Sequence, residues 1–564
     1  MSSNARAVQI LREIGDLLDL QGEKFKPEAY RRAARSIESL SEDLPKVAAR
    51  DELRTIPGVG DAIEEKLQEF LRTGTIEYFE RLRKEVPPGI VELMHLAGIG
   101  PKTARRLWVE LGIEGPAELL TAIDAGRLVG LAGFKDRKIA QLRDAVARTG
   151  GPTEERRLFA DVWPIAQRLV EELRRQAPVD QVELAGSVRR RRETIGDLDI
   201  LVTSRDAEKV FDIATKLPEV QSIVLRGPTK ETLIYQPGIQ VDIRVLVPES
   251  FGAALQYFTG SKDHNVRLRS IARDRGLKIN EYGVFRGDER IAGATEADVY
   301  ATLGLPLIPP EIRENQGEID AALAGTVPTL VEEQDLQGDL HVHVDNTATV
   351  ADIDRLLAEA RARGWSYIGV VITATGRGKR AGEPAPDVLA RIASLRRSKS
   401  EQAPALFLGW EGTAPPTRDQ TAEYAPDYWI LSLSQDTRTA SPPPRRDAAP
   451  LFAAHLATGD RAGAEEAAFA SVWLPWAQEN AVALEMTPRP GVDGLDSASA
   501  RRVGTAGVKL HLTGDARVGT AGTQIGLAVG FARRGWIEKG SVLNAQSDSA
   551  FIGSGRSRRK PSTR

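Results

Sequence analysis

The stretch that decides the fold is GSVRRRRETIGDLDIL, residues 186–201. It places two carboxylates, Asp197 and Asp199, at the start of an apolar run that predicts a β-strand. Residues i and i+2 of a strand face the same side, so we expect these carboxylates to lie together. Carboxylates held that close repel each other, and a divalent cation relieves the repulsion. The stretch therefore predicts a metal site on a strand.

A third acid, Asp242, lies in a second apolar strand pattern, VDIRVLV at 241–247. Three carboxylates on adjacent strands can hold two ions about 3.5–4 Å apart. Oxygen ligands suit Mg²⁺, so we expect two Mg²⁺ ions, for which Mn²⁺ can substitute. One ion would activate an attacking hydroxyl and the other would bind a triphosphate, with Asp242 placed to take the proton. Gly186 and Ser187 offer a backbone N–H and a hydroxyl to a phosphate, and Arg190 adds a guanidinium fork.

This combination is typical of nucleotidyltransferases in general. It does not choose among polymerases, enzymes that add tRNA ends and antibiotic-modifying enzymes. A lone Asp-x-Asp would also fit a solvated strand end. Around the motif we expect strands at 182–188 and 197–204, and a hairpin or two adjacent strands at 232–248 around Pro237-Gly238, which gives this region an α+β character.

Two upstream segments share an apolar stretch, a Gly-x-Gly turn and an amphipathic helix. They span 53–74 and 93–113, with a weaker copy at 126–146, and their glycines are Gly58, Gly60, Gly98 and Gly100. Glycine leaves the amide N–H groups of a helix N-terminus uncovered, and such an end holds phosphates. These segments resemble helix-hairpin-helix motifs. Together with Lys102 after the second turn, they predict two sites that bind the phosphates of a nucleic-acid backbone. The alternative is that they are tight turns that bind no ligand.

The motifs FKPEAYRRAA, IPGVGDAIEEKL, GSVRRRRETIGDLDIL, QVDIRVLVPESFGAALQYFTGSKDHN and INEYGVF follow one another along the chain. In this order and spacing, residues 1–315 resemble a family X DNA polymerase, the family of DNA polymerase beta. The resemblance implies a DNA-directed DNA polymerase that fills short gaps during DNA repair, in base excision repair or end joining. It transfers dNMP from a dNTP to a primer 3′-hydroxyl.

The resemblance also implies roles for single residues. Asp197, Asp199 and Asp242 would be the catalytic, metal-binding carboxylates. Arg269 would contact the template strand. The residues implied to hold the incoming nucleotide are Gly186, Ser187, Arg190, Gly196, Tyr257, Phe258, Gly260, Ser261, Lys262 and Asn265. Gly260-Ser261 would form the turn beneath the sugar, commonly with a cis peptide bond, and Lys262 stands where the beta enzyme has an acid.

Animal members of the family carry a lyase activity in the N-terminal domain, where a lysine forms a Schiff base with an abasic sugar. Lys66 aligns with that nucleophile, and Lys26 and Tyr30 align with its 5′-phosphate pocket. Ala62 occupies a position where the beta enzyme has another lysine, so fewer cations would surround Lys66. A lysine that only helps to hold a 5′-phosphate is the alternative.

From residue 336 a β/α alternation begins with GDLHVH at 338–343, in which His341 and His343 share one face of a strand. This region resembles the PHP domain, a metal-dependent phosphoesterase with a distorted β/α barrel fold. Several family ligands are replaced; for example, the final Asp-Ala-His is here Asp515-Ala516-Arg517. The remnants are His341, His343, Glu411, His455 and Asp515, so we expect nuclease activity to be weak or absent.

The expected fold is therefore multidomain α+β. We expect a DNA-binding, lyase-like helical domain (1–85), a fingers-like helix-hairpin-helix domain (86–150), a palm (151–247), a thumb (248–315), a linker (316–335), the PHP-like domain (336–555) and a basic tail (556–564). We also expect 436–450 to be a mobile loop.

Composition sets further limits. The 564 residues include no cysteine, which excludes disulfides and thiolate zinc sites, and 76 basic residues nearly balance 79 acidic ones. No apolar run approaches the ~20 residues needed to cross a bilayer. We expect a cytoplasmic, nucleoid-associated monomer whose partners are dNTPs, gapped or nicked duplex DNA and other repair proteins. The alternatives are a nuclease that works through its barrel and a noncatalytic scaffold that binds gaps.

Overall fold

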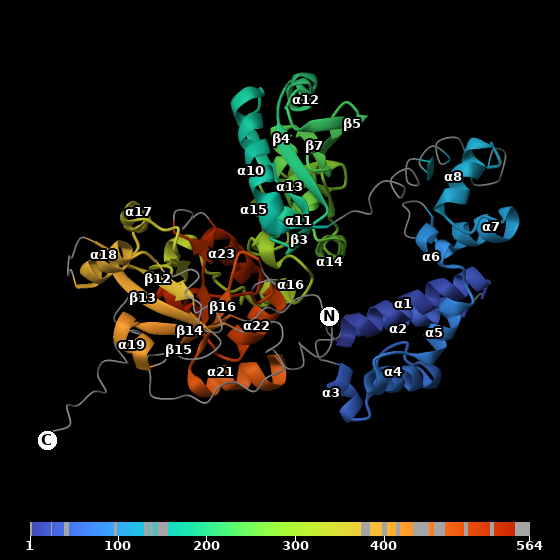
Figure 1. The fold of residues 1–564 in the computed structure, drawn as a ribbon. Coiled ribbons are helices and arrows are strands. Elements are labelled where there is room, and N and C mark those ends of the chain that lie inside the picture. Colours follow the sequence, from blue (N-terminus) through green and yellow to red (C-terminus); the bar gives the residue numbers. More distant parts are fainter. Residues whose placement is uncertain are drawn as a thin grey trace. The chain divides into compact units, whose positions relative to one another are not determined.

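The computed structural model describes residues 3–23, 25–38, 44–94, 99–128, 134, 139, 142–143, 156–373, 384–397, 403–412, 418–432, 451–455, 469–489, 494–518 and 524–546. It divides into two compact units, residues 1–155 and 156–564 (Figure 1). Among the helices of these ranges, none is long and apolar enough to span a membrane. The expected loop at 436–450 and tail at 556–564 lie outside the described residues.

The first unit is helical. Its helices are α1 (Ser3–Gln21), α2 (Lys26–Glu38), α3 (Leu44–Ala49), α4 (Asp61–Thr73), α5 (Glu77–Lys84), α6 (Pro88–Met94), α7 (Pro101–Leu111) and α8 (Pro116–Asp124), with a 3₁₀ turn at Leu53–Thr55. One apolar core runs through the unit from Ala7 to Leu142. The long helix α1 packs against α2, α5 and α7. Most of the weak third repeat at 126–146 lies outside the described residues.

The second unit begins with the palm, a five-stranded sheet. In spatial order its strands are β2 (Gln181–Leu184), β4 (Asp197–Thr203), β7 (Ile239–Leu246), β6 (Lys230–Tyr235) and β5 (Val220–Arg226). The central pair β4 and β7 is parallel and the other pairs are antiparallel. The expected hairpin at Pro237-Gly238 is confirmed as β6–β7. A short ribbon, β1 (Arg157–Leu158) with β3 (Thr194–Ile195), lies beside the sheet.

Successive side chains of β4 point to opposite faces of the palm sheet, and only one face carries Asp197 and Asp199. Leu198, Ile200 and Val202 are buried in the core that also contains helix α10 (Phe159–Gln176) and helix α12 (Ala207–Thr215). The opposite face carries Asp197 and Asp199, followed by Leu201, which packs against helix α13 (Phe251–Thr259). The two carboxylates therefore share the face that α13 covers only in part.

The thumb follows the palm directly. It contains α13, α14 (Lys262–Asp274), a three-stranded sheet of β8 (Lys278–Asn280), β9 (Gly283–Arg286) and β10 (Glu289–Ala292), then α15 (Glu296–Thr302) and the 3₁₀ turn η3 (Pro310–Ile312).

The segment 316–335, expected to be a linker, is folded against the thumb. It forms helix α16 (Glu318–Ala324), and Ile319, Ala322 and Leu330 are buried in the thumb core. The buried Glu318 carboxylate accepts hydrogen bonds from the backbone of Asn315 and Gln316 and lies 2.6 Å from the His264 ring. The sequence alone did not predict this helix, because its burial depends on residues elsewhere in the chain.

A parallel eight-stranded sheet with helices on its outside completes the unit. The strands are β11 (Val342–His343), β12 (Tyr367–Thr373), β13 (Ala405–Gly412), β14 (Tyr428–Ser432), β15 (Leu451–His455), β16 (Ala483–Met486), β17 (Leu510–Leu512) and β18 (Ala516–Arg517). The helices include α17 (Val350–Ala362), α18 (Pro386–Arg397), α19 (Arg418–Tyr424), α21 (Leu474–Asn480), α22 (Ser497–Thr505) and α23 (Ile525–Arg534).

The sheet curls back on itself. Its order runs from β17 through β16 to β11 and ends at β18, so β17 and β18 are the two edge strands. Only residues 513–515 join these strands in sequence, which brings the two edges together. The expected distorted β/α barrel is thus confirmed (Figure 1).

One expected strand is wrong in its second half. The strand predicted at 182–188 ends at Leu184, and Gly186–Arg189 form a short helix, α11. Gly186 has a φ of +61°, and a Cβ there would lie 2.5 Å from an Asp199 oxygen. The turn needs glycine, and it ends the strand.

Candidate active site

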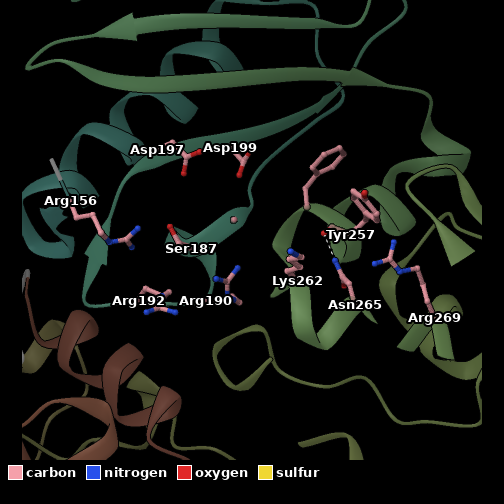
Figure 2. A pocket seen from close by; sticks show the side chains of 13 residues that line it. Arg156, Ser187, Arg190, Arg192, Asp197, Asp199, Tyr257, Lys262, Asn265 and Arg269 are labelled. Atoms are coloured by element: carbon pink, nitrogen blue, oxygen red, sulfur yellow. Dashed lines mark hydrogen bonds between the residues drawn. The ribbon is translucent and has the colours of Figure 1, made fainter. Parts of the chain in front are cut away.

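The three palm aspartates lie on the two central strands of the palm sheet. Asp199 of β4 and Asp242 of β7 are direct partners across the parallel pair, and Asp197 lies two residues earlier on the same face. Figure 2 shows Asp197 and Asp199 pointing into one cavity beside Ser187. The sequence predicts this juxtaposition for Asp197 and Asp199, whereas the pairing with Asp242 is a product of the fold.

The charges of this group are only partly compensated. Burial, together with the charges of Asp197 and Asp242, raises the pKa of Asp199 to about 7. Asp242 is buried, accepts a hydrogen bond of 2.6 Å from Thr232 Oγ1 and pairs with Lys230 Nζ at 2.6 Å. Oxygen donors that crowd this much negative charge fit a divalent cation, which would take the place of the proton that Asp199 otherwise holds.

Asp197 and Asp199 line a cavity of about 510 Å³, whereas Asp242 lies behind them and is not part of its lining. Its lining combines the carboxylates with cations and one aromatic pair: Arg156, Gly186, Ser187, Arg190, Arg192, Asp197, Asp199, Tyr257, Phe258, Gly260, Lys262, Asn265 and Arg269 (Figure 2). Of the residues that we expect to hold a nucleotide, Gly196 and Ser261 are outside this lining. A cavity with acids at one end and arginines beside them suits a metal-bound triphosphate.

Helix α13 and the turn after it form the far wall. The Tyr257 and Phe258 rings meet edge to face with centroids 5.1 Å apart, and the Arg244 guanidinium lies 4.2 Å from the Phe258 ring. The Gly260-Ser261 peptide bond is cis, as the resemblance implies. The Asn265 amide donates to the Tyr257 carbonyl at 2.7 Å and accepts from Gln256, so its orientation is fixed before any ligand arrives.

Three cationic side chains of this site were not predicted from the sequence. Arg156 and Arg192 line the cavity, and Lys230 neutralises Asp242. Arg192 had a visible signal, because it extends the arginine run that starts at Arg189. Lys230 had none, since it reaches Asp242 from the neighbouring strand β6.

In the first unit, the two Gly-x-Gly turns start helices in the same way. Gly60 is the N-cap of α4 and Gly100 the N-cap of α7, and a Cβ at either position would meet open space. Gly58 has a φ of +87°, and a Cβ there would lie 2.9 Å from the Arg32 side chain. Lys102 is exposed in the first turn of α7, while Gly98 lies outside the described residues. Both helix starts thus leave room for a phosphate.

Lys66 is half-buried on α4 and donates to the Ala62 carbonyl at 3.1 Å. Its Nζ lies 5.0 Å from the Tyr78 ring, and the Arg81 guanidinium lies 5.2 Å from the same ring. Tyr78 in turn stacks on Tyr30, which is buried, and Lys26 is exposed at the start of α2. Arg81 therefore supplies a neighbouring cation that the sequence comparison at Ala62 did not reveal.

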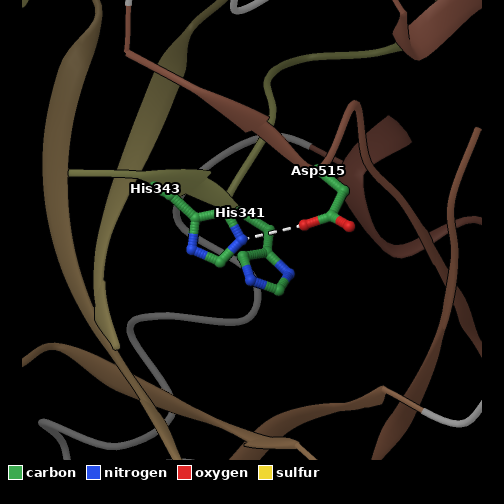
Figure 3. A group of neighbouring side chains, drawn as sticks. All are labelled: His341, His343 and Asp515. Atoms are coloured by element: carbon green, nitrogen blue, oxygen red, sulfur yellow. Dashed lines mark hydrogen bonds and ion pairs between the residues drawn. The ribbon is translucent and has the colours of Figure 1, made fainter. Parts of the chain in front are cut away.

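In the barrel, His341, His343 and Asp515 bring one ligand atom each within 4.8 Å of the others (Figure 3). His343 Nε2 lies 2.9 Å from Asp515 Oδ1, and Glu411 approaches both imidazoles at 3.7–3.8 Å. His341 and Glu411 are buried. The side chain of His455, at the end of β15, lies outside the described residues.

Glu485 and His511 also lie buried inside the barrel, and neither was predicted from the sequence as a site residue. Glu485 accepts from His341 Nδ1 at 2.9 Å and lies 2.9 Å from His511 Nδ1. Burial opposes the charge of His341, but Glu485 and Glu411 outweigh it and raise the pKa of His341 well above its usual value. A single acid inside the apolar strand ALEM at 483–486 was the available signal. Among the described residues, the ligand atoms of His341, His343 and Asp515 lie close enough to hold one ion, and a multinuclear cluster needs more ligands than these.

Taken together, the fold and the cavity define a nucleotidyltransferase that carries helical hairpins suited to a nucleic-acid backbone. Three family models match the chain: a DNA polymerase beta thumb at 254–314, a helix-hairpin-helix domain at 2–76 and a SAM-like helix-hairpin-helix tandem at 90–148. The chain is 29% identical, over 96% of its length and 97% of the relative's, to "DNA polymerase/3′-5′ exonuclease PolX" of Bacillus subtilis.

It is also similar to eukaryotic relatives over about half its length. It is 26% identical to DNA polymerase lambda of Rattus norvegicus over 55% of this chain and 56% of that protein. It is 25% identical to DNA polymerase lambda of Arabidopsis thaliana over 55% of this chain and 62% of that protein. The chain is therefore similar to family X DNA polymerases, over nearly its whole length in the bacterial relative and over about half of it in the eukaryotic ones.

Proposed function

We propose that this protein fills short gaps in duplex DNA, transferring dNMP from a dNTP to a primer 3′-hydroxyl. The observation that carries the proposal is the pairing of Asp242 with Asp199 beside Asp197, with Asp197 and Asp199 at one end of a cavity whose other walls are cationic and aromatic. The primer oxygen forms a bond to the α-phosphorus of the dNTP. The bond between that phosphorus and the bridging oxygen breaks, and pyrophosphate leaves.

The chain's own groups orient this reaction. Ser187 and Arg190 hold the triphosphate, Tyr257 and Phe258 pack at the sugar, and Asp242 accepts the proton of the primer hydroxyl. Asp197, Asp199 and Asp242 would hold Mg²⁺, which would supply positive charge to activate this hydroxyl and to stabilise the departing pyrophosphate. Lys262, Asn265 and Arg269 surround the nucleotide and the template.

We assign the grip on DNA to the Gly-x-Gly turns at Gly60 and Gly100, where N-terminal backbone N–H groups receive phosphates on both sides of the gap. Such binding is mainly electrostatic and weakens steeply with salt. Because the proposed substrates are duplex DNA and dNTPs, we propose that the protein acts at the nucleoid; we also propose that it acts as a monomer.

The direct test uses a duplex with a one-nucleotide gap and a labelled primer. With Mg²⁺ or Mn²⁺ we expect extension by the templated nucleotide only, and removal of the metal with EDTA should stop it because the aspartates then repel the triphosphate. A non-templated dNTP in the same assay is the control. Tight gap binding without extension under either metal would favour a noncatalytic scaffold.

A 3′-5′ exonuclease in the barrel is the second candidate function. The cluster of His341, His343 and Asp515 favours it, and the similar protein of Bacillus subtilis carries that activity in its name. We propose that the activity is weak or absent, because the surrounding carboxylates Glu411 and Glu485 are engaged with imidazoles. Omission of dNTPs from the gap assay separates the two functions, because only an exonuclease shortens the primer under that condition.

We also propose that Lys66 is the nucleophile of a 5′-deoxyribose phosphate lyase. The support is the neighbourhood of Tyr78, Arg81 and Tyr30, which offers a cation and an aromatic wall to a 5′-sugar phosphate. Lys66→Ala is expected to abolish borohydride trapping of the protein on a preincised abasic site, since no Schiff base can then form. Lys84→Ala, an exposed lysine on α5, is the control. If both variants are trapped equally, Lys66 is not the nucleophile and only contacts the 5′-phosphate.

A further inference from the structure

The arginine run that follows Ser187 lies against the barrel. The Arg191 guanidinium lies 4.0 Å from the Trp163 ring, and it passes so close to α23 that a Cβ on Gly530 would meet it at 3.0 Å. Arg191 also has a φ of +54°, a left-handed conformation that this packing holds in place. Barrel helix α23 is therefore a direct neighbour of the segment that carries Ser187 and Arg190.

Glu314, just after η3, links this segment to α23. Its Oε1 accepts from Arg190 Nε at 2.9 Å and from Arg534 Nη1, at the end of α23, at 2.7 Å. All three side chains are nearly buried, with 11–12% of each exposed. Arg190 is fixed further by a hydrogen bond to the Thr259 carbonyl. Arg190 lines the cavity, whereas Glu314 and Arg534 stand behind it.

Arg534 also contacts the backbone of the same segment. Its Nη1 donates to the Arg190 carbonyl at 3.3 Å, and its Nε lies 3.5 Å from Glu193 Oε2. Glu314 Oε2 also lies 3.8 Å from Arg192 Nη1, a longer contact than the hydrogen bonds from Arg190 and Arg534. Without Arg534, the short contact of Glu314 would go to Arg190 alone, and its negative charge would offset the cation that faces a triphosphate. With Arg534 in place, the cations Arg190, Arg192 and Arg534 outnumber the carboxylates Glu314 and Glu193, so the group retains a positive charge toward the cavity.

We propose that Arg534 of the barrel is a positioning residue for the incoming nucleotide: by neutralising Glu314, it leaves Arg190 oriented and electrostatically available to the triphosphate. The inference rests on the proposed gap-filling function and extends it. It assigns the barrel a part in polymerisation that needs no metal of its own.

The test measures the dNTP dependence of single-turnover gap filling. Arg534→Met is expected to weaken the apparent dNTP affinity about tenfold, while the maximal rate changes less, because a charge beside the triphosphate is lost and the aspartates are untouched. Arg534→Lys retains the charge and should stay close to wild type. Adding Glu314→Gln to Arg534→Met should restore much of the affinity, because the uncompensated carboxylate is then removed.

Arg533→Met is the matched control. Arg533 lies on the same helix and crosses the same interface, where it binds Glu311 at 2.7 Å and the Val331 carbonyl at 3.1 Å. An equal affinity loss in Arg533→Met and Arg534→Met would mean that the barrel only stabilises the polymerase, and would overturn the inference. A lack of rescue by Glu314→Gln would do the same. If the wild type fails to extend the primer, the proposed function fails instead.

Discussion

Asp242→Asn is expected to lower the rate of gap filling by about a thousandfold or more. Asp242 is buried, it faces Asp199 across the β4–β7 pair, and we assign to it both metal binding and proton acceptance. An amide can do neither, and several kcal/mol of lost transition-state stabilisation correspond to a loss of this size. Asparagine has nearly the same shape, and it can still accept the hydrogen bond from Thr232.

The measurement is single-turnover extension of the one-nucleotide gap, with gap affinity followed in parallel by fluorescence anisotropy. Affinity should hold, because the DNA contacts that we propose lie elsewhere. Asp288→Asn, at an exposed carboxylate in the turn between β9 and β10, is the control and should retain full activity. Extension by Asp242→Asn at a rate near that of wild type would refute the assignment.

Glu296→Gln is expected to lower the free energy of unfolding by about 3–5 kcal/mol, the usual effect of removing one partner from a buried ion pair. Glu296 is buried in α15. Its carboxylate accepts two hydrogen bonds from Arg189, at 2.6 and 2.8 Å, and one from Arg313 at 2.5 Å. Arg313 is fully buried. The glutamine would leave the guanidinium of Arg313 without its carboxylate.

This destabilisation has a defined pH dependence. Burial opposes the charge of Glu296, but Arg189 and Arg313 outweigh it and lower the pKa of Glu296 to about 2. A carboxyl whose pKa is depressed on folding stabilises the protein above its ordinary pKa, and it loses this contribution as the pH falls toward the depressed value. The difference between wild type and Glu296→Gln should therefore be full near pH 7 and shrink between about pH 4.5 and pH 2.

Urea denaturation followed by tryptophan fluorescence measures both effects. Glu289→Gln, at an exposed position on β10, should cost little at any pH. An equal loss in the two variants, or a difference that stays constant down to pH 2, would show that the ion group does not stabilise the fold. Because Arg189 lies next to Arg190, we also expect the variant to bind dNTPs less tightly.

Several elements have a local signal. The apolar run that predicts a strand from Asp197 and the turn at Pro237-Gly238 each lie within a few residues. Helix α16 escaped prediction, since the residues that bury Ile319 and Ala322 come from the rest of the thumb. The exposed edge strand β5 escaped it too, because its Ile223, Val224 and Leu225 remain largely exposed and show no burial alternation.

At the active site, too, some features follow from the local sequence and others only from tertiary packing. The sequence by itself determined that Asp197 and Asp199 share a strand face and that a β/α region begins at His341 and His343, because strand period acts within a few residues. Only the structure showed that residue 186 must be glycine. Only the tertiary structure decided that Lys230 neutralises Asp242, that Glu485 joins His341 to His511, and that Arg534 reaches Glu314 from 220 residues away. Charges pair through space, so their partners are set by packing rather than by spacing along the chain.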